Sequence, residues 1–140
     1  MTQQEQQEQQ VARQSAGVGE RYAVAVARYF EAWNATEEGA RARAVAAAFG
    51  EDATYTDPLA DVAGHEGLAA AIAGVHAQFP GFVFRQLGVV DGHHDIVRFG
   101  WELVSVADGA APVAGFDVVR LGADGRIRSV FGFLDRVPAV

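Results

Sequence analysis

Residues Asp95–Val106 read DIVRFGWELVSV, and every second side chain from Val97 to Leu103 is large and apolar. The side chains between them are charged, or absent in the case of glycine. Alternation with a period of two is typical of a strand that has one face on a core and the other toward solvent. We therefore predict a strand of an antiparallel sheet whose inner face carries Phe99 and Trp101.

Other strands are expected on both sides of this one. Asp-Gly pairs at residues 91–92, 108–109 and 124–125 are turn signals that divide the chain into short segments. The predicted strands are Ala53–Pro58, Phe82–Val90, Val113–Leu121 and Ile127–Val137.

The first half of the chain predicts helices, because its apolar side chains recur at steps of three and four residues. A helix that begins near Glu20 has a stripe made of Tyr22, Val26, Tyr29, Phe30 and Trp33. Two further helices are predicted at Ala40–Phe49, ended by Gly50, and at Glu66–Phe79. Residues 1–18 form a Gln- and Glu-rich tail that cannot bury enough surface to fold alone, although it can form a frayed helix.

These elements predict an α+β fold, with a tail at residues 1–18 and a single domain at residues 19–140. Three N-terminal helices would cover a strongly curved, mostly antiparallel sheet. The concave space between the two layers would be lined with apolar side chains, which is a common setting for a small-molecule pocket.

Composition excludes several classes of function. The chain has 140 residues, half of them apolar, and a formal net charge of −7, which argues against nucleic acid and anionic membranes as partners. It has no cysteine, and all 11 basic residues are arginine. Thiolate and Schiff-base chemistry are therefore excluded, so any catalysis must use residues such as Asp, Glu, His, Tyr, Arg, Ser and Thr.

Localisation and cofactors are predicted from missing signals. The sequence shows neither a leader pattern nor an apolar run of membrane-spanning length, so we expect a soluble cytoplasmic protein. His65, His93 and His94 lie in predicted loops or turns, and no histidine spacing favours a metal site. We expect no metal and no cofactor.

Asp57 is the first candidate for chemistry, because it ends a predicted strand just before Pro58, which favours an extended backbone at the preceding residue. Its carboxylate could act as a general base at the mouth of a pocket. The alternative is a structural aspartate that caps a turn.

Asp117 is the second candidate, because it lies well inside the apolar strand Val113–Leu121. Aspartate is depleted in strands, and burial of an ionised carboxylate is costly. A buried Asp117 would have a raised pKa and could donate a hydrogen bond to an oxyanion. Alternatively, it is exposed and paired with an arginine of a neighbouring strand, Arg98, Arg120 or Arg128.

Tyr29 and His76 are further polar candidates on the predicted helices. The Tyr29 hydroxyl could donate to a substrate oxygen or bond within the core. His76 lies at the edge of the third helix's apolar stripe and could point into a pocket.

Three segments together resemble a known family: Ala27–Glu31 (ARYFE), Glu51–Pro58 (EDATYTDP) and Phe116–Leu121 (FDVVRL) with Gly125–Ile127 after it. From Arg21 to Val137 the chain resembles the NTF2-like superfamily, in particular its SnoaL-like polyketide cyclase and ketosteroid isomerase branches. The resemblance implies a cone-shaped fold.

The resemblance also implies a reaction, namely cofactor-independent proton transfer next to a carbonyl of an apolar substrate. Asp57 would be the base, while a protonated Asp117 and Tyr29 would donate to the enolate oxygen. The positions at which the isomerase has further pocket tyrosines fall on Phe49 and Ile72, which lack a hydroxyl.

Two other functions are considered: a non-catalytic ligand-binding or dimerisation module, and a limonene-type epoxide hydrolase. The hydrolase branch uses an Asp–Arg–Asp set. By alternation, Arg98 faces away from a pocket that Phe99 and Trp101 line, which weakens that reading.

We expect the pocket wall to consist of Trp33, Phe49, Tyr55, Leu68, Ile72, His76, Phe79, Phe99, Trp101 and residues of the last strand. For that strand, alternation places Ile127, Phe131 and Phe133 inward. The resemblance instead places Val130, Gly132 and Leu134 inward, which requires a bulge after Ile127. Either set leaves an apolar outer face that, with Phe116 and Val118, predicts a homodimer through the sheets.

Overall fold

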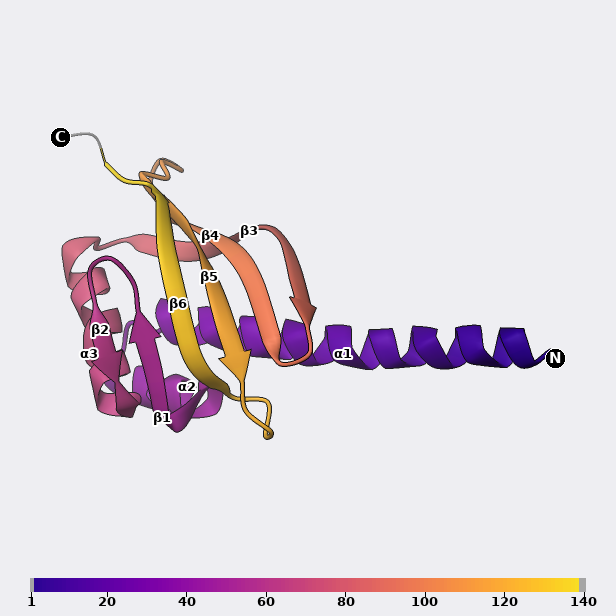
Figure 1. The fold of residues 1–140 in the computed structure, drawn as a ribbon. Coiled ribbons are helices and arrows are strands. Elements are labelled where there is room, and N and C mark those ends of the chain that lie inside the picture. Colours follow the sequence, from indigo (N-terminus) through magenta and orange to yellow (C-terminus); the bar gives the residue numbers. More distant parts are fainter. Residues whose placement is uncertain (1, 139–140) are drawn as a thin grey trace.

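Three helices lie against one face of a six-stranded sheet (Figure 1) in a computed structural model that describes residues 2–138 and their side chains except those of residues 9–18. The predicted α+β fold is confirmed. In chain order the elements are α1 (Gln3–Asn34), α2 (Glu38–Ala48), β1 (Phe49–Thr56), β2 (Asp61–Ala63), α3 (Gly64–Gln78), β3 (Phe82–His93), β4 (Ile96–Ser105), β5 (Val113–Leu121) and β6 (Ile127–Arg136).

The strands are ordered β2-β1-β6-β5-β4-β3. Neighbouring strands are antiparallel except for β1 and β6, which are parallel. Register shifts interrupt the β1–β6, β3–β4 and β5–β6 ladders. Bulges of this kind bend a sheet, and the curved sheet encloses the space beneath the helices.

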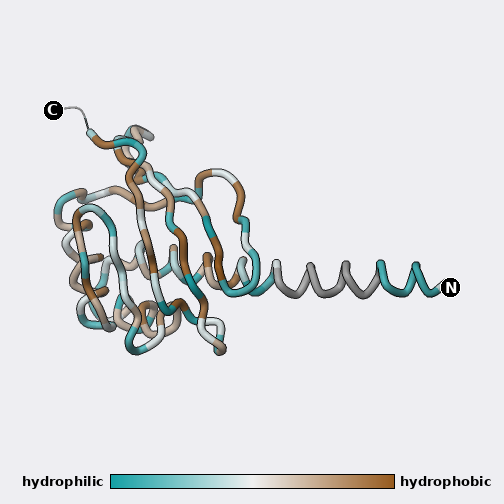
Figure 2. Tube along the Cα trace, viewed as in Figure 1, coloured by the Kyte–Doolittle hydropathy of each residue, from teal (hydrophilic) through white to brown (hydrophobic). Residues whose placement is uncertain are grey.

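Helix α1 supplies the central packing surface of the domain. Its Tyr29 ring meets the rings of Phe49 and Phe99 edge to face, at centroid distances of 6.0 and 4.9 Å. The first turns of α1 project away from the sheet (Figure 1), and their described end is hydrophilic (Figure 2). The N-terminal sequence is rich in Gln and Glu and has no apolar stripe, so this end of α1 has no surface that would pack against the sheet.

The C-terminal end of α1 is fixed to two other elements by hydrogen bonds. The Asn34 amide donates to the Phe84 carbonyl at 3.0 Å, and the Phe84 N–H donates to the Asn34 Oδ1 at 2.7 Å. Nε2 of His76, on α3, lies 2.6 Å from the Trp33 carbonyl oxygen. These bonds fix the position of Trp33 between β3 and α3.

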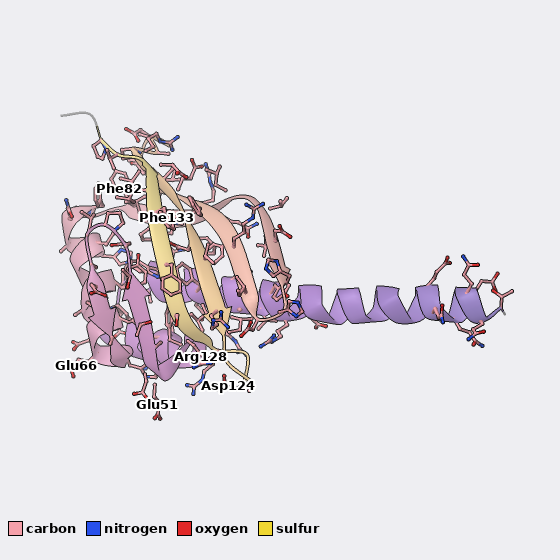
Figure 3. The ribbon with its side chains drawn as sticks, in the orientation of Figure 1. Glu51, Glu66, Phe82, Asp124, Arg128 and Phe133 are labelled. Carbon is pink, nitrogen blue, oxygen red and sulfur yellow. The ribbon has the colours of Figure 1, made fainter. Side chains whose placement is uncertain are left out.

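The inner face of β6 follows the resemblance rather than simple alternation. Ile127 and Val130 are both buried, while Phe131 and Phe133 are half exposed (50 and 51%). The β5–β6 register passes from Leu121 opposite Ile127 to Arg120 opposite Ser129, so one extra residue of β6 lies between them. This bulge places Gly132 inside and Phe133 on the outer face of the sheet (Figure 3).

Some predicted boundaries are wrong for local reasons. Phe49 and Gly50 belong to β1, because Phe49, the C-cap residue of α2, already has an extended backbone. Asp91–Gly92 lies within β3, and the turn falls at His94, which has a φ of 50°. Strand β2 was not predicted, since three residues are too short for a periodic signal.

None of the helices within residues 2–138 is both long enough and apolar enough to cross a membrane.

Candidate active site

A cavity of about 300 Å³ lies between the helices and the inner face of the sheet. The β1–β2 turn and the end of β6 lie at the same end of the sheet (Figure 1), and both contribute lining residues there. The lining consists of Tyr29, Trp33, Tyr55, Asp57, Leu59, Val75, Gln78, Phe79, Phe84, Trp101, Leu103, Val113, Leu134, Val137 and Pro138. Asp57 is the one acidic or basic side chain among these lining residues, so the cavity suits a neutral, apolar molecule.

Asp57 caps its turn and also lines the cavity, so both roles predicted from the sequence occur in one residue. Its Oδ1 accepts hydrogen bonds from the backbone N–H groups of Leu59 and Ala60, each at 2.8 Å. Its Oδ2 accepts from the Tyr55 hydroxyl at 2.6 Å. Each carboxylate oxygen has two lone pairs, so Oδ2 can accept one more hydrogen bond or a proton.

Asp117 is buried, with 1% of its surface exposed, and it does not line the cavity. The hydroxyl of Tyr29, a residue that does line the cavity, donates to its Oδ2 at 2.6 Å. The predicted arginine pairing is not found: Arg98 pairs with Asp91 and Arg120 with Asp95. Asp117 therefore lies behind the residues that line the cavity, and it is hydrogen-bonded to one of them, Tyr29.

Burial shifts the proton affinities of this cluster. Burial raises the pKa of Asp117 to about 7, although the neighbouring Tyr29 hydroxyl opposes the rise; the charge of Asp57 adds to it. Burial, followed by the charge of Asp117, raises the pKa of Tyr29 well above its usual value, and burial also raises the pKa of Tyr55. Near neutral pH both hydroxyls keep their protons, and Asp117 is protonated in a large fraction of molecules.

Gly132 lets the two carboxyl groups approach each other. A Cβ at this position would lie 2.7 Å from Oδ1 of Asp117 and 3.1 Å from Cβ of Asp57. Only a residue without a side chain fits between them. A glycine inside an otherwise apolar strand is the sequence signal that could have indicated this close approach.

The structure gives Tyr55 a role beyond that of an apolar wall. Because Phe49 and Ile72 lack hydroxyls, the sequence predicted a smaller set of hydrogen-bond donors. Tyr55 supplies one, since its hydroxyl bonds to Asp57 while its ring lies 5.4 Å from that of Trp33.

The structure separates the residues predicted for the wall into two groups. Trp33, Tyr55, Phe79 and Trp101 line the cavity, but five other predicted residues do not. Phe49, Leu68, Ile72 and Phe99 are buried in the hydrophobic core instead. The fifth is His76, whose ring is held by the Trp33 carbonyl.

Several lining residues were not predicted as wall. Leu59 and Val137 lie outside regular elements, so no periodic pattern marks them, and Phe84 and Leu103 gave no signal that distinguishes a wall from a core position. In the part of the chain that the structure describes, no three His, Asp or Glu side chains group as they would around a metal ion.

Comparison with known proteins shows the family. A model of the SnoaL-like domain matches residues 26–130, so the chain belongs to the SnoaL-like family. No curated protein matches the chain.

Solved structures agree with this assignment. The chain is 39% identical to a "putative isomerase of the SnoaL-like family" from Agrobacterium tumefaciens str. C58, with a TM-score of 0.78 over 82% of this chain and 97% of that one. A "putative SnoaL-like polyketide cyclase" from Jannaschia sp. CCS1 is 19% identical, with a TM-score of 0.66 and coverages of 82 and 85%. A "putative polyketide cyclase" from Sinorhizobium meliloti is 18% identical, with a TM-score of 0.60 and coverages of 77 and 92%. The last two show the fold alone.

The close approach at Gly132 predicts that Gly132→Ala destabilises the protein, because the new methyl group must displace Asp117 or Asp57. We expect a loss of about 1–3 kcal/mol in the free energy of unfolding, measured in urea. The control is Gly74→Ala on α3, where a Cβ meets nothing within 4 Å. It should gain about 0.5–1 kcal/mol, and equal effects of the two variants would contradict the steric account.

The raised pKa of Asp117 predicts a stability that falls as pH rises from about 4 to about 7. In this range the folded chain holds a proton on Asp117 that the unfolded chain releases, so a rise in pH favours unfolding. The free energy of unfolding of the wild type, compared with Asp117→Asn across this range, isolates the effect. The difference between the two should change steadily up to pH 7 and then level off; a difference that is constant with pH would disprove the shift.

Proposed function

We propose that this protein is a cofactor-independent enzyme that transfers a proton at the carbon next to a carbonyl of a neutral, apolar substrate. One observation carries the proposal: the Tyr55–Asp57 and Tyr29–Asp117 pairs approach each other across Gly132 beside an apolar cavity. A base and a hydroxyl donor are thus available beside the same apolar cavity.

In this mechanism Asp57 Oδ2 takes the proton from the carbon, and the electrons of the C–H bond move to the carbonyl oxygen. The Tyr29 hydroxyl donates to that oxygen as it becomes an enolate. In an isomerase, Asp57 then returns the proton to another carbon. In a cyclase, the enolate carbon instead attacks a second carbonyl of the same molecule, and Asp57 returns the proton to the oxygen of that carbonyl as it becomes a hydroxyl.

Asp117 has a different role from the one inferred from the resemblance. Since it lies behind Tyr29 and does not line the cavity, we assign it as a positioning residue that acts through the Tyr29 hydroxyl. A protonated Asp117 donates to the Tyr29 oxygen, which turns the tyrosine's own O–H toward the cavity. An ionised Asp117 would instead hold that O–H for itself.

The relative from Agrobacterium tumefaciens, at 39% identity, is named a "putative isomerase", which agrees with this reaction class. The hydrolase alternative has less support. Arg98 is exposed and paired with Asp91, and no arginine lines the cavity within the described residues.

The proposal predicts that the protein accelerates exchange of the α-hydrogens of 2-tetralone, a neutral bicyclic ketone, for deuterium in D₂O, followed by proton NMR. Asp57→Asn should abolish the acceleration, because an amide cannot take the proton. Tyr29→Phe should reduce it roughly 10²- to 10³-fold through loss of the donor to the enolate.

Asp52→Asn is the matched control, since Asp52 is an exposed carboxylate on the same strand as Asp57 and should leave the rate unchanged. Normal exchange by Asp57→Asn would contradict its role as the base. A wild type that binds 2-tetralone without accelerating exchange would favour the non-catalytic binding module, in which Asp57 only caps its turn.

We also propose that a second copy of the chain covers the outer face of the sheet. Phe131 and Phe133 are half exposed there, and the Phe133 ring stacks on Phe116 at 4.9 Å. An apolar face of this kind favours a symmetric contact between two copies.

This contact predicts that Phe133→Glu shifts the molecular mass in solution from dimer to monomer, because it would bury a charge against its own copy. Light scattering after size exclusion measures the change. The control is Val106→Glu in the loop after β4, where an apolar side chain is 70% exposed and does not border the stacked pair; it should stay dimeric. A monomeric wild type would contradict the proposal.

A further inference from the structure

The cavity wall contains a buried hydrogen-bond donor that the proposed chemistry does not use. Among the described residues, Nε1 of Trp33 is the one fully buried side-chain nitrogen or oxygen that has no hydrogen-bond partner. Trp33 is 4% exposed, and its side chain lines the cavity. A buried donor without a partner is costly, so a ligand oxygen that reaches it gains affinity.

The surroundings of Trp33 offer its N–H only weak acceptors. The nearest rings are those of Phe84, which meets the indole edge to face at 5.2 Å, and of Tyr55, tilted at 5.4 Å. The face of an aromatic ring accepts a hydrogen bond far less well than an oxygen does. A ligand oxygen would therefore be a better partner than the protein supplies.

Trp33 is also held in place as a binding residue would be. The bonds between Asn34 and Phe84 and the contact of His76 with the Trp33 carbonyl fix its backbone from two sides. Trp33 follows Tyr29 by four residues on α1, so the two side chains lie on the same face of the helix, with ring centroids 6.1 Å apart.

We propose that Trp33 is a specificity-determining residue, whose indole N–H donates to a second oxygen of the substrate beside the oxygen that Tyr29 binds. The substrate class is then a neutral, apolar molecule with two oxygen acceptors, at a spacing set by two rings whose centroids lie 6.1 Å apart. This inference rests on the proposed function, because it uses Tyr29 as the first anchor. Since Nε1 is buried, the second oxygen reaches it through a small rotation of the indole.

The test uses three aromatic alcohols that differ in one group: 1-naphthol, 7-methoxy-1-naphthol and 7-ethyl-1-naphthol. The hydroxyl serves Tyr29 in all three, whereas only the methoxy group offers a second oxygen, and the ethyl group matches it in size. We expect the wild type to bind the methoxy compound about threefold to tenfold more tightly than the ethyl compound. Trp33→Phe, which keeps an aromatic ring, should bind the two equally.

A second readout is measured on the wild-type protein. The chain has two tryptophans, so its proton–nitrogen NMR spectrum has two indole signals, and Trp33→Phe assigns them. The Trp33 indole proton should move downfield with the methoxy compound and not with the ethyl compound. Equal shifts and equal affinities for the two compounds would overturn the role of Trp33. In that case, binding of 1-naphthol would still support the cavity as a ligand site. Failure of all three to bind would overturn the proposed function as well.

Discussion

The hydrogen bond between the Tyr29 hydroxyl and Asp117 is the interaction on which the site depends. It joins α1 to β5 across the core at 2.6 Å, and both partners are almost completely buried. An ionised carboxyl group there would be costly, so the pKa of Asp117 rises and the pair holds a proton near neutral pH. In the proposed mechanism, that proton frees the Tyr29 hydroxyl to donate to the enolate oxygen.

The fold holds a second carboxyl group close to this pair without burying it in the same way. Asp57 ends β1, where two backbone N–H groups and Tyr55 orient its oxygens. The bulge in β6 turns Gly132 inward, and the missing side chain leaves room for both acids. One aspartate is thus behind the wall and the other on it, and this difference in burial is what separates their proposed roles.

Much of this arrangement could be predicted from the sequence. The alternation in β4 and the stripe of α1 predict the two layers. An aspartate inside an apolar strand marks Asp117 as a candidate, but the sequence left open whether it is buried or is exposed and paired with arginine. The inner face of β6 could not be predicted from periodicity, because one extra residue reverses the alternation after Ile127. The resemblance supplied that information, and the structure agrees with it.

What the sequence could not predict is depth within the layers. Leu68 and Ile72 share a stripe with Phe79, but they are buried in the core, whereas Phe79 reaches the cavity. Periodicity assigns a side chain to a face and not to a distance along it. For the same reason, periodicity could not predict that Asp117 lies behind Tyr29 or that the N–H of Trp33 has no partner. Both features depend on contacts between distant segments.

The central claim is that Asp117 holds its proton up to neutral pH. Carbon-13 NMR of the side-chain carboxyl carbons, followed from pH 4 to pH 9 and assigned by Asp117→Asn, tests it most directly. The account predicts that the Asp117 signal titrates with a midpoint of about 7. A midpoint of about 4, the usual value of an exposed aspartate, would contradict it.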